Sequence, residues 1–283
     1  MKKYFSKLLK ENIISVSSVS GGDINDAYKI ISSSNVYFAK TNKMVNATDM
    51  FEKEAQNLKL LKENAEIYVP DVIETGQYND LSYLILEWIE PGKSNPATND
   101  NLAHQLVILH NTHVNSFGLN YNNYIGSLPQ DNTEKYNWLE FYFINRIEYQ
   151  LKIAIDAKLM KKTSIKKTET MFSNVEKDFP DVVPSLLHGD LWSGNFMINK
   201  SGNAVFIDPA VYYGYREMDI AMMKLFGGFS SDVYYKYNEQ LPMDHDWNSR
   251  LRFNQLYYIL VHVNLFGGNY VNLAESIINY YSS

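Results

Sequence analysis

The sequence predicts an α+β protein of two lobes, a small β-rich N-terminal lobe with one key helix and a larger, mainly helical C-terminal lobe. Short runs of β-branched and aromatic residues fill the first ~90 residues, with one strongly periodic helix among them. After the Glu90-Pro91-Gly92 hinge the hydrophobic spacing is helical almost to the end of the chain. We therefore expect one lobe at residues 1–89 and the other at 90–283, with a cleft between them.

The composition is that of an ordinary globular protein and excludes several kinds of chemistry. The chain has 283 residues, of which 45% are hydrophobic and 20% charged, enough for a substantial core. It contains no cysteine, which excludes disulfides, thiolate metal sites, cysteine nucleophiles and any cysteine-based redox switch. A net charge of −6 argues against a general nucleic-acid-binding protein, which needs a basic face.

The sequence also predicts no membrane association. No segment is long and apolar enough to span a bilayer. The N-terminus has early lysines but neither an apolar stretch nor a small-residue cleavage site, so it is not expected to be a signal peptide. Its spacing is that of a short amphipathic helix. We expect the protein in the cytosol.

The N-terminal lobe is expected to contain strands at 13–19, 27–31, 36–40 and 83–88. A helix should begin near Asp49, which can cap it together with Glu52 three residues later. Its apolar spacing places Glu54 on the same face as Phe51, Ala55 and Leu58. A carboxylate on such a face needs a buried partner, unless it lies at the helix edge in water.

The C-terminal lobe is expected to be built from helices around 102–113, 139–151 and 250–281, the last broken by Gly267-Gly268. Residues 152–167 carry six lysines, which indicate a solvated helix face and loop. Between these helices lie two short apolar runs, 196–198 and 204–207, separated by the turn sequence 199–203. We expect these two runs to pair as a β-hairpin.

The most informative motif is the sequence around this hairpin. Asp190 follows His188 in an H-x-D pattern, and Asn195 follows Asp190 after four intervening residues. This is the spacing of a phosphotransferase catalytic loop, in which the Asp acts as base and the Asn binds magnesium. If the hairpin closes, Asn195 and Asp208 lie side by side at its open end. Two oxygen ligands beside a third carboxylate suit a nucleotide-bound Mg²⁺.

Each piece of this motif also has an ordinary structural interpretation. An isolated H-x-D is common, an Asn before a strand is often a turn residue, and Asp-Pro often ends a strand. The joint occurrence of Asp190, Asn195 and Asp208 at compatible spacings favours the catalytic interpretation.

The N-terminal lobe offers matching candidates for nucleotide binding. Gly21 and Gly22 lie between two predicted strands, where backbone N–H groups can approach phosphate, although Gly-Gly is also a common hairpin turn. Lys40 ends the third strand and can reach the α- and β-phosphates if Glu54 holds it. The backbone of Glu87, Trp88 and Ile89, at the hinge, would then contact the adenine ring.

Taken together, these residues resemble the fructosamine kinase (ketosamine-3-kinase) family. The resemblance covers nearly the whole chain, and shorter matches occur at 117–119, 123–126 and 265–268. Trp192 and the Tyr-Gly-x-Arg-Glu run distinguish the pattern from that of aminoglycoside phosphotransferases. The most specific runs are SGGDINDAY (20–28), HGDLWSGN (188–195), IDPA (207–210) and YGYREMDIAM (213–222).

The resemblance implies a protein-kinase-like fold and an ATP- and Mg²⁺-dependent phosphorylation of the 3-hydroxyl of a ketosamine. The acceptor would be a ribulosamine, an erythrulosamine or a fructosamine, and the unstable product would shed its sugar in a deglycation repair. The acceptor amine can be a small molecule or a protein side chain. Asp23 stands where several family members have a cysteine. The preferred sugar and the oligomeric state stay open.

The resemblance also suggests residues for the acceptor side. Trp192 could form a wall of the sugar pocket by stacking. Arg216 and Glu217 could bind sugar hydroxyls or the amine, with a local ion pair as the alternative. His188 is expected to brace the loop rather than to take part in the chemistry, and Asp219 to bond the backbone of the catalytic loop.

Two other functions stay open at this point. One is an aminoglycoside or other small-molecule sugar or amine phosphotransferase, against which the family-specific motifs argue. The other is an inactive nucleotide-binding scaffold, in which one of Lys40, Asp190 and Asp208 would normally be lost.

Overall fold

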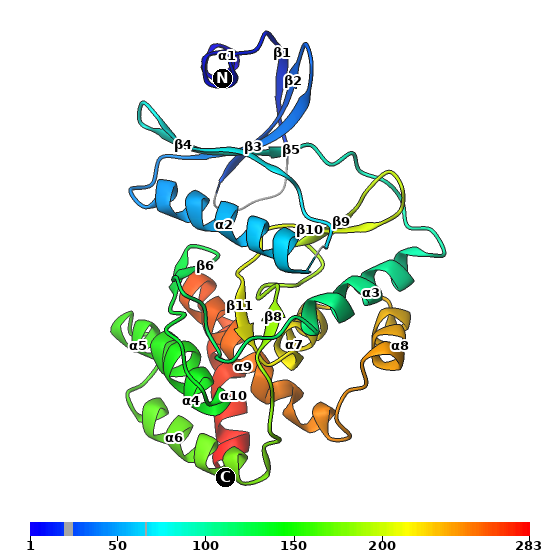
Figure 1. Cartoon of the computed structure of the whole chain (residues 1–283). Coiled ribbons are helices and arrows are strands. Elements are labelled where there is room, and N and C mark those ends of the chain that lie inside the picture. The colour runs from blue at the N-terminus through cyan, green and yellow to red at the C-terminus, as the bar shows by residue number, and fades with distance from the viewer. Residues whose placement is uncertain (20–24, 66) are drawn as a thin grey trace.

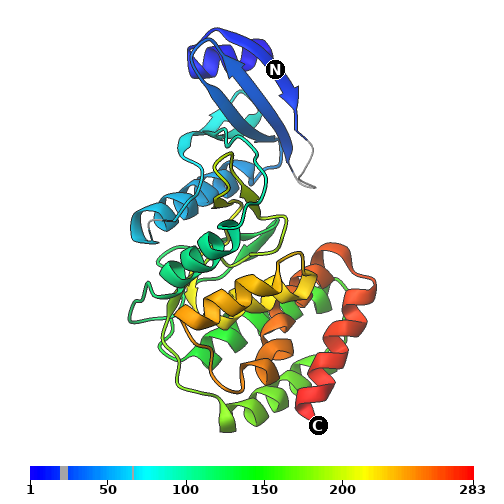
Figure 2. The same cartoon turned by 90° about the vertical axis from the view of Figure 1, so that its right-hand side faces the viewer.

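The computed structural model describes residues 1–19, 25–65 and 67–283 and shows the expected α+β architecture in two lobes (Figures 1 and 2). An antiparallel sheet in the order β1-β2-β3-β5-β4 forms most of the N-terminal lobe. Its strands are β1 (Ile13–Ser18), β2 (Asp26–Ser32), β3 (Val36–Asn42), β4 (Val72–Tyr78) and β5 (Leu81–Glu87). The two helices of this lobe are α1 (Lys2–Leu9) and α2 (Ala47–Ala65).

Two details of the N-terminal lobe differ from the sequence prediction. Strand β4 was not expected, because its seven residues are mostly exposed or half-buried and include Gly76. Helix α2 begins at Ala47, so Asp49 lies in the first turn instead of capping the helix. The Asp49 carboxylate accepts a hydrogen bond from the Tyr124 hydroxyl at 2.6 Å.

The C-terminal lobe is mainly helical, as predicted. Short irregular helices at Tyr142–Glu148 (π) and Glu176–Asp178 (3₁₀) continue α4 and α6. Gly267 and Gly268 separate α9 from α10, also as predicted. The α-helices are α3 (Thr98–His110), α4 (Trp138–Phe141), α5 (Tyr149–Asp156), α6 (Thr163–Val175), α7 (Glu217–Phe226), α8 (Ser231–Gln240), α9 (Trp247–Phe266) and α10 (Asn269–Ser282).

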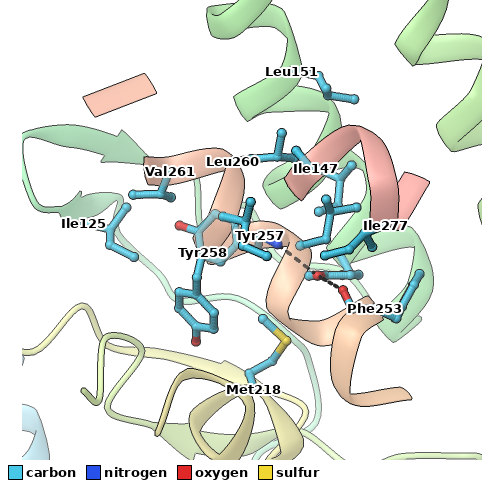
Figure 3. Packing of buried hydrophobic residues seen from close by; sticks show 14 of the residues in the cluster. Ile125, Ile147, Leu151, Met218, Phe253, Tyr257, Tyr258, Leu260, Val261 and Ile277 are labelled. Carbon is cyan, nitrogen blue, oxygen red and sulfur yellow. Dashed lines mark hydrogen bonds between the residues drawn. The ribbon is translucent and has the colours of Figure 1, made fainter. Parts of the chain in front are cut away.

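A buried core surrounds α9 in this lobe (Figure 3). Phe253, Tyr257, Tyr258 and Leu260 of α9 are at most 1% exposed. The Tyr142 hydroxyl donates to the Phe253 carbonyl at 2.7 Å and accepts from the Tyr257 amide at 3.3 Å. The Tyr142 hydroxyl therefore keeps polar partners inside an otherwise apolar core.

A second core joins the two lobes. It combines Phe51, Ala55 and Leu58 of α2 and residues of β5 with residues of α3, α7 and the segments around 186–206. The hydrophobic face of α2 is therefore buried against both lobes. This shared core fixes α2 relative to the C-terminal lobe.

Three short antiparallel pairs complete the C-terminal lobe: β6 (Asn123–Ile125) with β7 (Leu128–Gln130), β8 (Ser185–Leu187) with β11 (Tyr212–Gly214), and β9 (Phe196–Ile198) with β10 (Ala204–Phe206). The β9–β10 hairpin is the one predicted from the sequence. The segment after the hinge holds it, because the Gly92 amide donates to the Ile198 carbonyl at 2.8 Å and the Thr98 hydroxyl donates to the Gly202 carbonyl at 2.7 Å. Among the described residues, no helix combines the length and apolarity needed to cross a membrane.

Candidate active site

The loop after β8 carries Asp190 and is held by two buried side chains. Asp219, in the first turn of α7, accepts hydrogen bonds from the His188 amide at 2.8 Å and from the Gly189 amide at 2.9 Å. A carboxylate that accepts two backbone N–H groups fixes the path of the loop. Asp219 therefore has the loop-bracing contacts that the resemblance implied.

His188 connects the Asp190 loop to the strand that leads to Asp208. Its Nε2 lies 3.0 Å from the Ile207 carbonyl and its Nδ1 lies 3.3 Å from the Asp190 amide. Nε2 therefore carries the proton and donates, while Nδ1 accepts. Burial lowers the pKa of His188, which keeps the ring neutral. Both ring nitrogens are used, which supports a bracing role.

Gly189 is required by the close approach of a neighbouring segment. Its φ is +82°, and a Cβ atom there would lie 2.0 Å from the Ala210 carbonyl oxygen. Only glycine combines this conformation with this contact at low cost. The loop can therefore pass directly beneath the residues that follow Asp208.

Asn195 and Asp208 are brought to the same end of the β9–β10 hairpin. The Ile207 amide donates to the Asn195 carbonyl at 3.0 Å, which continues the pairing up to the residue before Asp208. The Asn195 side-chain amide donates to the Asp190 carbonyl at 2.8 Å and to its carboxylate at 3.0 Å. Asp208 adopts a left-handed conformation with φ 55°, one that Asp tolerates better than most residues. The three predicted residues thus form one group.

Lys40 of β3 joins this group from the N-terminal lobe. Its ammonium lies 2.8 Å from the Glu54 carboxylate and 2.7 Å from the Asp208 carboxylate. The Lys40 side chain is only 9% exposed and Glu54 16%, whereas Asp208 is 44% exposed. The Glu54 partner predicted from the sequence is therefore present, and the ion pair extends to Asp208.

The charges in this cluster shift one another's pKa values. Burial alone would lower the pKa of Lys40, but the carboxylates of Asp208 and Glu54 raise it above its usual value. Burial and the Asp208 charge raise the pKa of Glu54 despite the attraction of Lys40. Lys40 is therefore firmly protonated and able to hold negatively charged groups.

Asp190 has the properties of a proton acceptor. Burial, followed by the nearby charge of Asp208, raises the pKa of Asp190 well above its usual value, and the hydrogen bond from Asn195 only partly offsets this. A raised carboxyl pKa makes a stronger base once the group is ionised. Asp190 combines this basicity with a position beside both Asn195 and Asp208.

The residues present fit a magnesium ion that is held together with phosphates. The Asn195 amide N–H₂ faces Asp190, so the Oδ1 atom is the one free to act as a ligand beside the half-exposed Asp208. No group of three or more His, Cys, Asp or Glu side chains in the described ranges could hold a metal ion by itself. Mg²⁺ typically uses one or two protein oxygens and completes its shell with phosphate and water.

A buried polar network that the sequence reasoning missed supports the Asp208 segment. Asn57 of α2, 2% exposed, donates to the Pro209 carbonyl at 2.8 Å. Its side-chain oxygen accepts from the Tyr121 hydroxyl and from the Asn123 amide, each at 3.1 Å. Asn57 lies one turn after Glu54, so one helix holds both the Lys40 partner and the backbone after Asp208.

The network continues into the C-terminal lobe. Asn123 donates to the Val211 carbonyl at 2.8 Å and Gln130 donates to the Ala210 carbonyl at 3.0 Å. Gln130 in turn accepts from the Tyr257 hydroxyl of α9 at 2.7 Å. The carbonyls of residues 209, 210 and 211 therefore each have a buried side-chain donor. Gln130 and Tyr124 both have partners within the protein.

Other predicted nucleotide contacts are only partly placed. Gly21 and Gly22 lie outside the described residues. At the hinge, the Glu87 amide donates to the Asp71 carbonyl at 2.8 Å, and the Trp88 indole donates to Glu90 at 2.8 Å beneath the Lys29 ammonium. Ile89 is half-buried next to them. The adenine contact of the hinge backbone stays a prediction.

Arg216 and Glu217 do not join the Asp190 group. Glu217 is 2% exposed and pairs with Arg250 of α9 at 2.5 Å, with further bonds from Tyr215 and Asn254. Arg216 donates to the Leu241 carbonyl at 3.0 Å and to the Pro242 carbonyl at 2.5 Å. These contacts bind α7 to α9 and to the end of α8, and the local pair between Arg216 and Glu217 is not formed. The geometry therefore argues against the acceptor-binding role suggested for both.

Trp192 lies beside the site and is 40% exposed. Its amide donates to the Asp190 carbonyl at 3.2 Å, and a Cβ on Gly194 would come within 2.2 Å of its ring. Glycine at position 194 therefore leaves room for the indole beside the loop.

Comparison with known proteins agrees with this geometry. The sequence model of the fructosamine kinase family matches residues 2–282. The chain belongs to the fructosamine kinase family. It is therefore a phosphotransferase of the ketoamine kinase type. The chain is 38% identical over 264 residues to a probable ketoamine kinase of Enterococcus faecium, covering 92% of each protein.

Two further relatives extend the comparison. The chain is 38% identical to a chloroplastic protein-ribulosamine 3-kinase of Arabidopsis thaliana, covering 95% of this chain and 83% of the relative. The crystal structure of a putative fructosamine-3-kinase from Haemophilus somnus superposes with a TM-score of 0.87 at 28% identity, covering 100% and 96% of the two chains. An aminoglycoside phosphotransferase matches with a TM-score of 0.63 at 14% identity over 99% of both chains, which shows a shared fold alone.

The raised pKa of Asp190 predicts an unusual effect on stability. A carboxyl whose pKa is higher in the folded than in the unfolded protein makes the folded protein less stable as the pH rises from the unfolded-state pKa to the folded-state pKa. We expect Asp190→Asn to have a higher melting temperature than the wild type at pH 8, with the difference shrinking at acid pH. The check is differential scanning calorimetry across pH, with the exposed Asp181→Asn as control. A difference independent of pH would contradict the prediction.

The Asn57 contacts predict a loss of stability when this side chain becomes apolar. Asn57→Leu keeps the branched shape of the side chain but leaves the Pro209 carbonyl and the Tyr121 hydroxyl without their partner, which should cost about 1–3 kcal/mol. Urea unfolding measures this free energy. Asn64→Leu, at an exposed position of the same helix, should change it by less than about 0.5 kcal/mol. Equal effects of the two changes would show that the network contributes nothing specific.

Proposed function

We propose that this protein transfers the γ-phosphate of ATP to the 3-hydroxyl of a ketosamine, in a reaction that uses Mg²⁺ and leads to deglycation. The observation that carries the proposal is that Lys40 pairs with Glu54 and Asp208 at 2.8 and 2.7 Å, while Asn195 bonds Asp190 at 3.0 Å. The Ile207 amide bonds the Asn195 carbonyl at 3.0 Å and so brings these two groups together. The family membership supplies the reaction type. We place the reaction in the cytosol, where ATP is available.

In the proposed mechanism Asp190 accepts a hydrogen bond from the acceptor hydroxyl and aims its oxygen at the γ-phosphorus. As the oxygen–phosphorus bond forms and the bond to the ADP oxygen breaks, the hydroxyl proton passes to the Asp190 carboxylate. Positioning and charge neutralisation supply most of the rate acceleration in such transfers. His188 and Asp219 act indirectly by keeping the Asp190 backbone in place.

The nucleotide side uses groups from both lobes. Lys40 neutralises α- and β-phosphate oxygens, and Glu54 keeps it in position. Asn195 and Asp208 would hold Mg²⁺, which supplies positive charge to the phosphates when bound. The backbone at Glu87, Trp88 and Ile89 contacts adenine, and Gly21 and Gly22 cover the phosphates. An aminoglycoside phosphotransferase of the same fold is described in a ternary complex with ADP and hygromycin B.

The acceptor is proposed to be a ribulosamine, an erythrulosamine or a fructosamine. The names of the relatives support this class, since one is a protein-ribulosamine 3-kinase and another a putative fructosamine-3-kinase. Trp192 is the proposed stacking surface for the sugar. A phosphotransferase for aminoglycosides is the second candidate, but the likeness to those enzymes at 14% identity is one of fold. An inactive scaffold is disfavoured because Lys40, Asp190 and Asp208 are all present, with Lys40 paired to Asp208 and Asp190 close enough to feel the Asp208 charge.

A substrate panel tests the reaction class. We expect Mg²⁺-dependent ATP turnover with ribulose-lysine, erythrulose-lysine or fructose-lysine and none with kanamycin. Phosphate transfer should be followed by ³¹P NMR, which distinguishes a 3-phosphate from other positions. Asp190→Asn serves as control and should lose at least about 10²-fold in kcat because the base is gone.

Each result of the panel has a clear meaning. Turnover of kanamycin alone would replace the proposal with the aminoglycoside alternative. Binding of ATP with turnover of no acceptor would favour the inactive scaffold. Wild-type rates in Asp190→Asn would remove Asp190 from its role.

The Lys40 contacts predict a specific defect in nucleotide use. Lys40→Ala removes a charge-assisted contact to the phosphates, so kcat/KM for ATP should fall about ten- to hundred-fold. The protein should still fold, since the raised pKa of Glu54 lets this carboxyl take up a proton. Steady-state kinetics with varied ATP measures the change. The matched control is Lys43→Ala, because Lys43 is an exposed lysine paired with Asp80, and this variant should leave kcat/KM for ATP unchanged. Unchanged kinetics in Lys40→Ala would show that Lys40 makes no phosphate contact.

A further inference from the structure

A chain of aromatic rings extends from Trp192 across the ends of three helices. Trp192 contacts Phe226 at the end of α7, with ring centroids 6.4 Å apart. Phe226 contacts His262 of α9 at 4.8 Å. His262 contacts Phe266 at 5.5 Å and Tyr270 of α10 at 4.9 Å. We call these five residues the aromatic surface.

The aromatic surface is exposed although it is made of large rings. Trp192 is 40% exposed, Phe226 38% and Phe266 60%, while His262 and Tyr270 are half-buried. Single exposed rings are ordinary, but rings in continuous contact form an apolar patch of the kind that usually marks a binding site. Leaving such a patch in water is unfavourable, so the exposure calls for a ligand.

The aromatic surface begins at the proposed site of phosphate transfer. Trp192 lies two residues after Asp190, and its amide bonds the Asp190 carbonyl at 3.2 Å. A Cβ on Gly228, which follows α7, would lie 2.5 Å from the side chain of Ser193, so the end of α7 lies against the catalytic loop. In Figure 2 the turn between α9 and α10, orange to red, lies at the upper edge of the C-terminal lobe, toward the N-terminal lobe. The rings therefore lead away from Asp190 along this edge.

The chemistry of the aromatic surface suits a cation attached to an aliphatic chain. His262 Nδ1 lies 2.8 Å from the Tyr258 carbonyl and so carries the proton, which leaves Nε2 as an acceptor. Burial lowers the pKa of His262, so the ring is neutral and does not repel a cation. Aromatic faces attract ammonium groups and pack against methylene chains.

We propose that the aromatic surface binds the amine-bearing arm of the acceptor, with the sugar held between Trp192 and Asp190. This inference rests on the proposed function. A glycated lysine side chain fits, because it joins a cationic secondary amine to four methylene groups. The sugar hydroxyl reaches Asp190 while the amine and the methylene chain lie along Phe226 and Phe266. The aromatic surface thus favours acceptors with a long arm over short ones.

The test compares two acceptors that carry the same ribulose, one on the ε-amine of N-α-acetyl-lysine and one on methylamine. We expect the wild type to have a lower KM for the lysine adduct. Phe226→Ser and Phe266→Ser should each raise this KM about tenfold. A loss of this size is expected when one cation–π contact and the packing of one ring against the methylene chain are removed. KM for the methylamine adduct should rise less than KM for the lysine adduct, so that the preference for the long arm falls in both variants. Tyr280→Ser, which removes a 63% exposed ring elsewhere on α10, is the matched control.

The outcomes separate this inference from the proposed function. If the wild type phosphorylates neither adduct, the proposed function fails. If it phosphorylates both with equal KM, and the serine variants match the wild type, the aromatic surface does not bind the arm. If light scattering shows a wild-type dimer that the serine variants lose, the surface is an interface between copies and the inference is overturned. Melting temperatures of the variants close to that of the wild type establish that each has folded.

Discussion

The buried ammonium of Lys40 is the interaction on which the rest of the site depends. A cation with 9% exposure is tolerable only if carboxylates surround it. Glu54 comes from α2 and Asp208 from the end of the β9–β10 hairpin, so three elements from two lobes must meet at one atom. Breaking either contact would leave a charge buried without its partner. The positions of β3, α2 and the hairpin are therefore specified together.

The same helix that supplies Glu54 also supports the backbone after Asp208. Asn57 holds the Pro209 carbonyl, and Asn123 and Gln130 hold the next two carbonyls from the other side. The apolar residues of α2 meanwhile belong to the core that spans both lobes. A rotation of α2 away from the site would have to break the ion pair, the amide bond and this core at once. The arrangement therefore fixes the position of α2 relative to the site through three independent kinds of contact.

The sequence was most informative where function depends on local spacing. The β9–β10 hairpin could be predicted because its turn residues and apolar runs are contiguous, and it explains why Asn195 and Asp208 meet. The partner of Lys40 could be predicted because a carboxylate on an apolar helix face needs a cation. Asn57 could not, since an isolated Asn on a helix gives no signal and its partners lie 64–152 residues away. The partner of Glu217 could not be predicted for the same reason, because Arg250 is 33 residues further on. Strand β4 was missed because the sheet edge gives it little hydrophobic pattern.

The charge balance of the site explains why nucleotide and divalent cation belong together in the proposed reaction. Asp208 and Glu54 pair with the single ammonium of Lys40, and burial, followed by the Asp208 charge, raises the pKa of Asp190. Phosphates added alone would bring further negative charge and raise the pKa of Asp190 more. A cation held by Asn195 and Asp208 would oppose this effect, because its positive charge would offset both the phosphates and the Asp208 charge that helps raise the pKa of Asp190. Two of the three N–H donors of Lys40 are used by the carboxylates, and the third can go to a phosphate oxygen without breaking the bridge between the lobes. The same ion would therefore strengthen the binding of the nucleotide and lower the pKa of Asp190. Binding of the nucleotide with its cation would in this way favour the ionised Asp190 carboxylate that accepts the proton.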